Sequence, residues 1–166
     1  NAARDAADAL RVSAGWTPAP PAALLEAGEP RFRVSDVSVG EWAAAPPGSA
    51  EAAWRDRLVE AANEVEAHRL TFFDLEGHDL GRTIDWNRDY KSGRRAPLRF
   101  GRWVDYRDFS RAGDCKLVWE PNRHHQLVVL ARAYRATGEK RYASAALRQL
   151  ESWLDACPFG RGMNWR

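Results

Sequence analysis

The chain has 166 residues, of which 45% are hydrophobic and 29% charged, values typical of a globular domain with a substantial core. No apolar run approaches the ~20 residues that a membrane-spanning helix needs, so we expect no membrane partner. Cys115 and Cys157 form no metal-binding or disulfide motif, and we expect two free thiols rather than a disulfide.

Positive charge is concentrated in the second half of the chain. Residues 1–81 carry 7 basic and 14 acidic groups, whereas residues 82–123 carry 11 basic and 6 acidic groups. Of the 25 basic residues, 22 are arginine, whose planar guanidinium suits bidentate contact with carboxylate or sulfate. A general bias toward Arg and Ala would also raise the arginine count, but it would not explain the clustering.

Residues 1–48 are interpreted as an N-terminal lead segment of short helices and irregular chain. Short helices are predicted over 2–13 and 22–27, and a short strand over 31–34, with prolines and glycines between them. A second domain is predicted over residues 49–166.

The second domain is expected to begin with an amphipathic helix. Ser49 is a good N-cap, and apolar residues then recur at spacings of four, three and four up to Val65. The helix is predicted to end near His68. Beyond it, residues 69–118 lose the helical period, although 72–75 are compatible with a short extended piece.

Residues 69–118 are also the most aromatic and most basic part of the chain, and a long irregular connection of this kind is often functional. Residues 81–95 mix Trp and Tyr with Arg and Asp, which indicates either a surface that binds sugar or a plain surface loop anchored by a buried Trp. Basic and aromatic residues also bind single-stranded nucleic acid, but Asp85 and Asp89 interrupt the positive field. We therefore expect no nucleic-acid partner.

Two further helices are predicted after this stretch. Pro121 fits the first turn of one helix, which Gly138 ends, and Glu139 opens the other. The short turn between them makes them antiparallel. The last helix carries an apolar stripe of Ala143, Ala146, Leu147, Leu150, Leu154 and Cys157. Because a helical hairpin buries such a stripe against the next hairpin, we expect the chain to be the first part of a longer helical array.

Residues 119–125 bring an aromatic ring, an acid, an amide, a guanidinium and two imidazoles to one predicted helix start. They indicate either a site that binds an acidic, hydroxyl-rich ligand or a capped helix whose polar groups face water. We expect no metal site, because His124 and His125 would diverge by ~100° on a helix. No phosphate-binding loop, GxSxG or HExxH motif occurs, and no cofactor is predicted.

A series of short motifs follows one another in a fixed order over roughly residues 70–166. These motifs include Phe73-Asp74-Leu75-Glu76-Gly77-His78, Ile84-Asp85-Trp86, Val104-Asp105-Tyr106, Trp119-Glu120 with Asn122-Arg123-His124, Thr137-Gly138-Glu139, Ser152-Trp153 and Gly160-Arg161-Gly162-Met163-Asn164-Trp165. In this order and spacing they resemble the N-terminal domain of heparinase II/III-type polysaccharide lyases.

The resemblance implies a mainly all-α fold, an incomplete (α/α) toroid of antiparallel helical hairpins with long irregular loops, followed elsewhere in the parent chain by a β-sandwich. It also implies β-elimination on a uronic acid in a heparin- or heparan-sulfate-like acidic polysaccharide, by a bacterial-type lyase. The catalytic residues of the family match no position of this chain. Residues expected to bind the substrate are Trp119, Glu120, Asn122, Arg123, His124, Asn164 and Trp165.

The expected partners are therefore an acidic polysaccharide and the remainder of the parent chain. This chain alone is expected to be inactive. A non-catalytic carbohydrate-binding or scaffold domain of the same fold is the alternative interpretation, and the presence or absence of a catalytic Tyr and His in the parent chain would distinguish the two.

Overall fold

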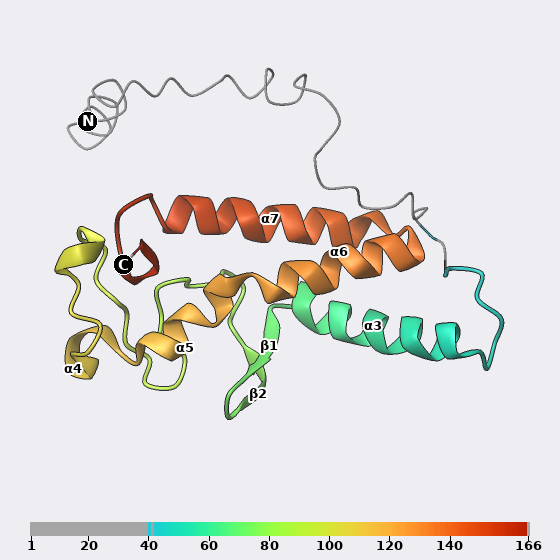
Figure 1. Cartoon of the computed structure of the whole chain (residues 1–166), viewed down its shortest axis with the longest axis horizontal. Coiled ribbons are helices and arrows are strands. Elements are labelled where there is room, and N and C mark those ends of the chain that lie inside the picture. Colours follow the sequence, from blue (N-terminus) through green and yellow to red (C-terminus); the bar gives the residue numbers. More distant parts are fainter. Residues whose placement is uncertain (1–39, 41, 166) are drawn as a thin grey trace, which may run out of the picture. The chain divides into compact units, whose positions relative to one another are not determined.

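The computed structural model describes residue 40 and residues 42–165, and the account below concerns only these (Figure 1). The predicted helices over 2–13 and 22–27 and the predicted strand over 31–34 lie outside the described residues. The described part is mainly helical, as expected, and it also contains one small sheet that was not predicted. Within it, no helix combines the length and apolar character needed to cross a bilayer.

Three long helices form the main packed body: α3 (Ala50–Glu66), α6 (His125–Thr137) and α7 (Lys140–Ala156). Ser49 caps α3 as predicted, because its side-chain oxygen accepts a hydrogen bond from the Ala52 N–H at 3.1 Å. In Figure 1, α6 lies between α3 and α7, and α7 runs back along α6. Their shared core consists of small and large apolar side chains: Ala62, Val65, Leu130, Ala133, Tyr142 and Ala145.

The leucines of the predicted apolar stripe of α7 are exposed rather than packed on the core, whereas Ala146 of the same stripe packs against the core and Cys157 is buried. Within the helix, Tyr142, Ala145 and Gln149 are buried instead, whereas Leu147 and Leu154 are 60% and 58% exposed. Polar bonds fix this rotation, since the Gln149 side chain donates to the Val65 carbonyl at 3.0 Å. The leucines of α7 therefore form a second, outward-facing apolar face.

A two-stranded antiparallel hairpin, β1 (Arg69–Phe72) and β2 (Leu75–Asp79), follows α3. The extended piece predicted over 72–75 therefore includes the hairpin turn, in which Phe73 adopts a φ of 52°. Phe72 at the end of β1 packs with Trp86 in a second apolar cluster. The hairpin thus connects the end of α3 to the irregular segment that follows.

The segment between β2 and α6 is irregular over most of its length, as predicted, but it contains short helical turns. These are η1 (Gly101–Trp103), α4 (Phe109–Ala112), α5 (Cys115–Trp119) and η2 (Pro121–Arg123). A further short helical turn, η3 (Met163–Trp165), follows α7 at the end of the described residues. Val104, Val118 and Met163 belong to one buried cluster, so this segment packs against the C-terminal turn.

The buried carboxylate of Asp89 organises the middle of the irregular segment. It accepts hydrogen bonds from the Ser92 hydroxyl at 2.5 Å and from the backbone N–H groups of Lys91, Ser92 and Asp114 at 2.9, 3.1 and 3.0 Å. Gly113 passes close to it, because a Cβ there would lie 2.6 Å from the Cβ of Asp89. Four hydrogen bonds to Asp89 and the close approach of Gly113 therefore hold this part of the irregular segment in place without a helix or a strand.

Candidate functional site

The block of residues 119–125 is divided among three local structures rather than forming one helix start. α5 ends at Trp119, Pro121 opens the 3-10 turn η2, and His124 adopts a left-handed conformation with φ 60° and ψ 23°. α6 begins only at His125, so the prediction that Pro121 occupies its first turn is wrong. Because the backbone changes direction twice, consecutive side chains point to different surroundings.

Asn122 joins four segments through its carboxamide. Its Nδ2 donates to the backbone carbonyls of Trp86 and Val118 at 2.8 and 2.6 Å, and its Oδ1 accepts from the Trp153 indole N–H at 2.7 Å. The Cys157 thiol lies 3.9 Å from the same oxygen. Both amide hydrogens are therefore engaged within the protein, and Asn122 positions Trp153 relative to α5.

A cavity of about 280 Å³ lies beside this junction. Its lining residues come from α5, η2, α7 and η3, and they are Trp119, Asn122, Arg123, Trp153, Met163 and Asn164. The Trp119 indole N–H donates to the Met163 carbonyl at 3.0 Å, and its ring lies 5.9 Å from that of Tyr106. Since Asn122 holds the second indole, the two tryptophan side chains of the cavity are both fixed by hydrogen bonds.

Arg123 gives the cavity its charge, because it alone is ionisable among the described residues that line it. Its side chain is exposed, and its Nε lies 3.4 Å from a carboxylate oxygen of Glu120. An exposed pair of this kind contributes only about 0–1 kcal/mol, so little free energy holds the guanidinium in this position. Arg123 is thus a cation at the edge of an aromatic cavity that an anionic ligand could engage.

Asn164 of η3 lines the cavity, and Trp165 of the same turn lies next to it in sequence. The Asn164 amide donates toward the Cys157 sulfur at 3.3 Å, while its buried Oδ1 has no hydrogen-bond partner among the described residues. The Trp165 indole N–H donates to the Cys157 carbonyl at 2.9 Å, and its ring lies 5.8 Å from that of Trp153. Trp165 therefore supports Trp153 from behind rather than lining the cavity.

His124 lies between two tryptophan rings, 6.0 Å from Trp86 and 4.7 Å from Trp153. Neither of its ring nitrogens has a hydrogen-bond partner in the described part of the chain. Burial lowers the pKa of His124 below its ordinary value, which favours the neutral imidazole. Its aromatic surroundings indicate a packing role, and it does not line the cavity.

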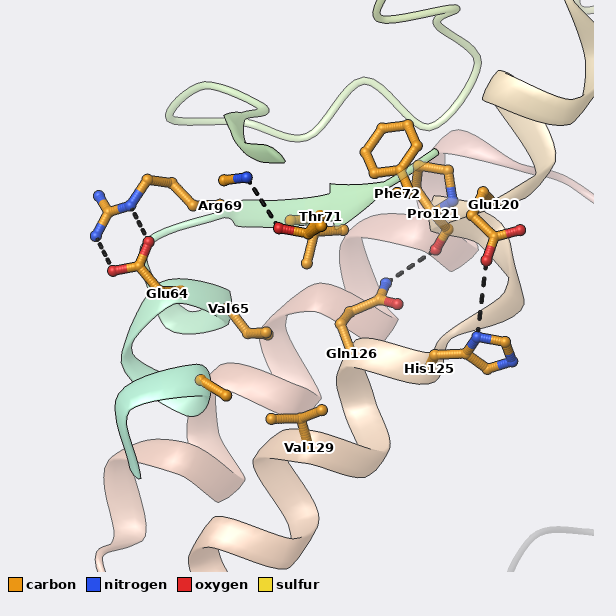
Figure 2. Close-up of a pocket in the computed structure, with 13 residues that line it drawn as sticks. Glu64, Val65, Arg69, Thr71, Phe72, Glu120, Pro121, His125, Gln126 and Val129 are labelled. Atoms are coloured by element: carbon orange, nitrogen blue, oxygen red, sulfur yellow. Dashed lines mark hydrogen bonds and ion pairs between the residues drawn. The ribbon is translucent and has the colours of Figure 1, made fainter. Parts of the chain in front are cut away.

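Glu120 faces a second cavity, of about 330 Å³, between α3, β1 and the start of α6. Figure 2 shows one oxygen of Glu120 toward His125, with the two groups 3.9 Å apart. The same view shows the Gln126 amide bonded to the Pro121 carbonyl at 2.9 Å and Arg69 paired with Glu64. Glu120 therefore lies beside Arg123, which lines the first cavity, and beside His125, which lines the second, but Glu120 does not itself line the first cavity.

The two free cysteines agree with the sequence-based expectation, and both are buried. Burial raises the pKa of the Cys157 thiol, although bonds from Asn164 and Asn87 oppose the shift. The thiol beside the cavity is therefore protonated at neutral pH, which makes it a poor nucleophile.

The sequence analysis did not select Trp153 or Met163 as site residues. Trp153 follows Tyr142 and Gln149 on the buried face of α7, at spacings of seven and four residues. A pattern that counts only apolar residues misses this face, because Gln149 interrupts it. Met163 lies in the Gly-rich segment after the last helix, and this segment has no periodic pattern that would mark a buried residue.

The described domain is thus a small helical body with an aromatic cavity and an arginine at the cavity's edge. A family model described as Heparinase II/III N-terminus matches residues 48–166, more than two thirds of the chain. The chain belongs to this family, as the resemblance predicted, and the match extends back to include α3. No curated protein and no solved structure matches the chain.

Proposed function

We propose that this chain is the sugar-binding N-terminal domain of a lyase that cleaves a uronic-acid-containing acidic polysaccharide, of the heparin or heparan sulfate kind. The observation that carries the proposal is the arrangement of Trp119, Trp153 and Arg123 around one cavity. Indole faces can stack on the C–H faces of sugar rings. A guanidinium binds carboxylate or sulfate through two parallel hydrogen bonds.

Within β-elimination, the cavity would supply binding rather than proton transfer. The reaction requires a group that neutralises the uronate carboxylate, a base that removes the C5 proton and an acid that protonates the leaving oxygen. Arg123 is suited to the first of these tasks. No Tyr, His, Lys or carboxylate occurs among the described residues that line the cavity. The base and acid are therefore proposed to come from other parts of the lyase.

The outward apolar face of α7 supports the proposal that the domain packs against more of its own parent chain. Leu147, Leu150 and Leu154 are exposed on one helix, at spacings of three and four residues. Apolar side chains gathered on one face of a helix commonly mark a protein interface. We propose that α6 and α7 are the first hairpin of an (α/α) toroid and that the next hairpin covers this face.

A non-catalytic carbohydrate-binding domain of the same fold is the alternative function. The described cavity residues include no acid–base pair. This observation is equally consistent with a binding domain and with a lyase whose acid and base lie in other parts of the protein. The intact parent protein distinguishes the two. A lyase produces an unsaturated uronate whose ultraviolet absorbance rises with time, whereas a binding protein retains the polymer without any rise.

Calorimetric titration of the chain with heparan sulfate, heparin, hyaluronan and alginate tests the binding function. We expect saturable binding to at least one polymer, about tenfold weaker for Arg123→Ala, since a hydrogen bond to a charged group contributes about 1.5–3 kcal/mol. Arg57→Ala is the matched control, because Arg57 is an exposed arginine on α3. Equal loss in both variants, or equal binding of single-stranded DNA, would indicate unspecific attraction of polyanions.

A further inference from the structure

Three large aromatic side chains are exposed close to the cavity but outside it. Phe100 is 47% exposed, Trp103 70% and Phe159 78%. The Phe100 and Trp103 rings meet edge to face at 5.5 Å, and the Phe159 ring contacts Trp165 at 4.8 Å. With the exposed Arg99 and Arg161 they form what is called here the arginine–aromatic patch.

Backbone contacts hold the two halves of this patch together. Phe100 pairs with Arg161 in an antiparallel bridge, the Gly162 N–H donates to the Arg99 carbonyl at 2.8 Å, and the Gly101 N–H donates to the Gly160 carbonyl at 2.8 Å. Gly101 permits this approach, because a Cβ there would lie 2.8 Å from the Trp165 carbonyl oxygen. The patch is therefore a fixed surface.

The chemistry of the patch suits an anionic sugar. Neither Arg99 nor Arg161 has an ion pair with another described residue, so both guanidinium groups are available to a ligand. Flat rings beside unpaired guanidiniums differ from the leucine face of α7, which carries aliphatic side chains alone.

The patch and the cavity share one short segment of chain. Phe159 and Arg161 belong to the patch, whereas Met163 and Asn164, two residues further on, line the cavity. The two places are also linked through aromatic rings, since Phe159 contacts Trp165 and the Trp165 ring lies 5.8 Å from that of Trp153, so a polymer longer than the cavity could reach the patch. A disaccharide seated between Trp119 and Trp153 would not need it.

We propose that the arginine–aromatic patch is a second subsite for acidic polysaccharide, which binds the part of the polymer that extends beyond the cavity. The proposal rests on the proposed function, because it assumes the same class of ligand. Trp103 and Phe100 would stack on sugar rings, and Arg99 and Arg161 would bind carboxylate or sulfate groups. The subsite would make affinity depend on the length of the ligand.

The test compares two ligands of the same repeat, a heparan sulfate disaccharide and the polymer, by calorimetric titration of the chain. We expect Trp103→Ala and Arg161→Gln each to weaken polymer binding by about five- to tenfold and to leave disaccharide binding unchanged. Arg123→Ala should weaken both ligands. Phe73→Ala and Arg57→Gln are the controls, since Phe73 is 59% exposed on the β1–β2 turn, away from the patch.

The possible failures are distinguishable. Absence of binding by the unmodified chain to either ligand would overturn the proposed function and this subsite with it. Polymer binding that falls with Arg123→Ala but not with Trp103→Ala or Arg161→Gln would overturn the subsite alone. A loss that Arg57→Gln reproduces would also overturn it, because net charge would then account for the effect. Circular dichroism of each variant confirms that the fold is retained.

Discussion

Replacing Asn122 by alanine should destabilise the domain strongly, although the residue sits beside the cavity as a ligand-binding residue would. The substitution removes a donor from the Trp86 and Val118 carbonyls and the acceptor of the Trp153 indole N–H. Trp86 is 1% exposed and Val118 is fully buried, so water cannot readily replace the lost bonds. The Trp86 carbonyl keeps a long bond from the Asn164 amide at 3.4 Å, which leaves two groups unsatisfied. Each buried polar group left unsatisfied costs about 1–3 kcal/mol, so the two together cost about 4 kcal/mol.

For a chain of this size, that loss corresponds to a fall in Tm of about 10–15 °C. Thermal and urea denaturation followed by tryptophan fluorescence measure it. Arg123→Ala is the neighbouring control and should shift Tm by less than about 3 °C, because its ion pair with Glu120 is exposed. The reasoning is refuted if Asn122→Ala melts within that same small margin, since the carboxamide would then not be a structural junction.

Three further substitutions test separate parts of the account. Burial lowers the folded-state pKa of His124, so the stability it contributes is fully present above the unfolded value of ~6.5 and is lost as pH falls through the lower folded value. His124→Asn should therefore flatten the fall in unfolding free energy between about pH 7 and pH 5, and an unchanged pH dependence would contradict a buried neutral imidazole. Gly113→Ala should cost roughly 3 kcal/mol in urea denaturation, because its Cβ would collide with Asp89 at a φ of 74°; a neutral result would mean that the loop relaxes freely. Leu154→Gln should change the unfolding free energy by less than about 0.5 kcal/mol, since Leu154 is 58% exposed, and a large loss would place it in the core.

Local signals predicted the helical elements well where one residue determines the outcome. Ser49 caps α3 by bonding the Ala52 N–H, and Gly138 ends α6 with a φ of 78°. Both effects depend on a single side chain, or on the lack of one, so they can be read directly from the sequence. The antiparallel return of α7 follows from the short turn after Gly138.

Periodicity identified the apolar stripe of α7 but could not determine which neighbour covers it. α7 packs on the core through Tyr142, Ala145 and Gln149, and the Gln149 amide nitrogen donates to the Val65 carbonyl on α3. Two apolar faces on one helix are ambiguous in sequence, since partners supplied from far along the chain decide which is inside.

The candidate site was predicted in part for a similar reason. Trp119 and Arg123 line the cavity, whereas His124 and Trp165 lie behind it against Trp153. Because His124 has a left-handed backbone conformation, the 3-10 turn that carries Arg123 and the helix that begins at His125 do not share one axis. A sequence that supplies the residue types does not reveal such a turn, because a positive φ is uncommon for any residue with a side chain, histidine included.

The most direct test of the central claim is to record the indole N–H resonances of the chain by NMR during titration with a heparan sulfate oligosaccharide. A ligand held in the cavity predicts chemical-shift changes at the Trp119 and Trp153 indoles. It predicts none at Trp54, which contacts Trp42 at 4.4 Å and does not line the cavity. Saturable binding that leaves the Trp119 and Trp153 resonances in place would contradict the claim and place the sugar site elsewhere on the domain.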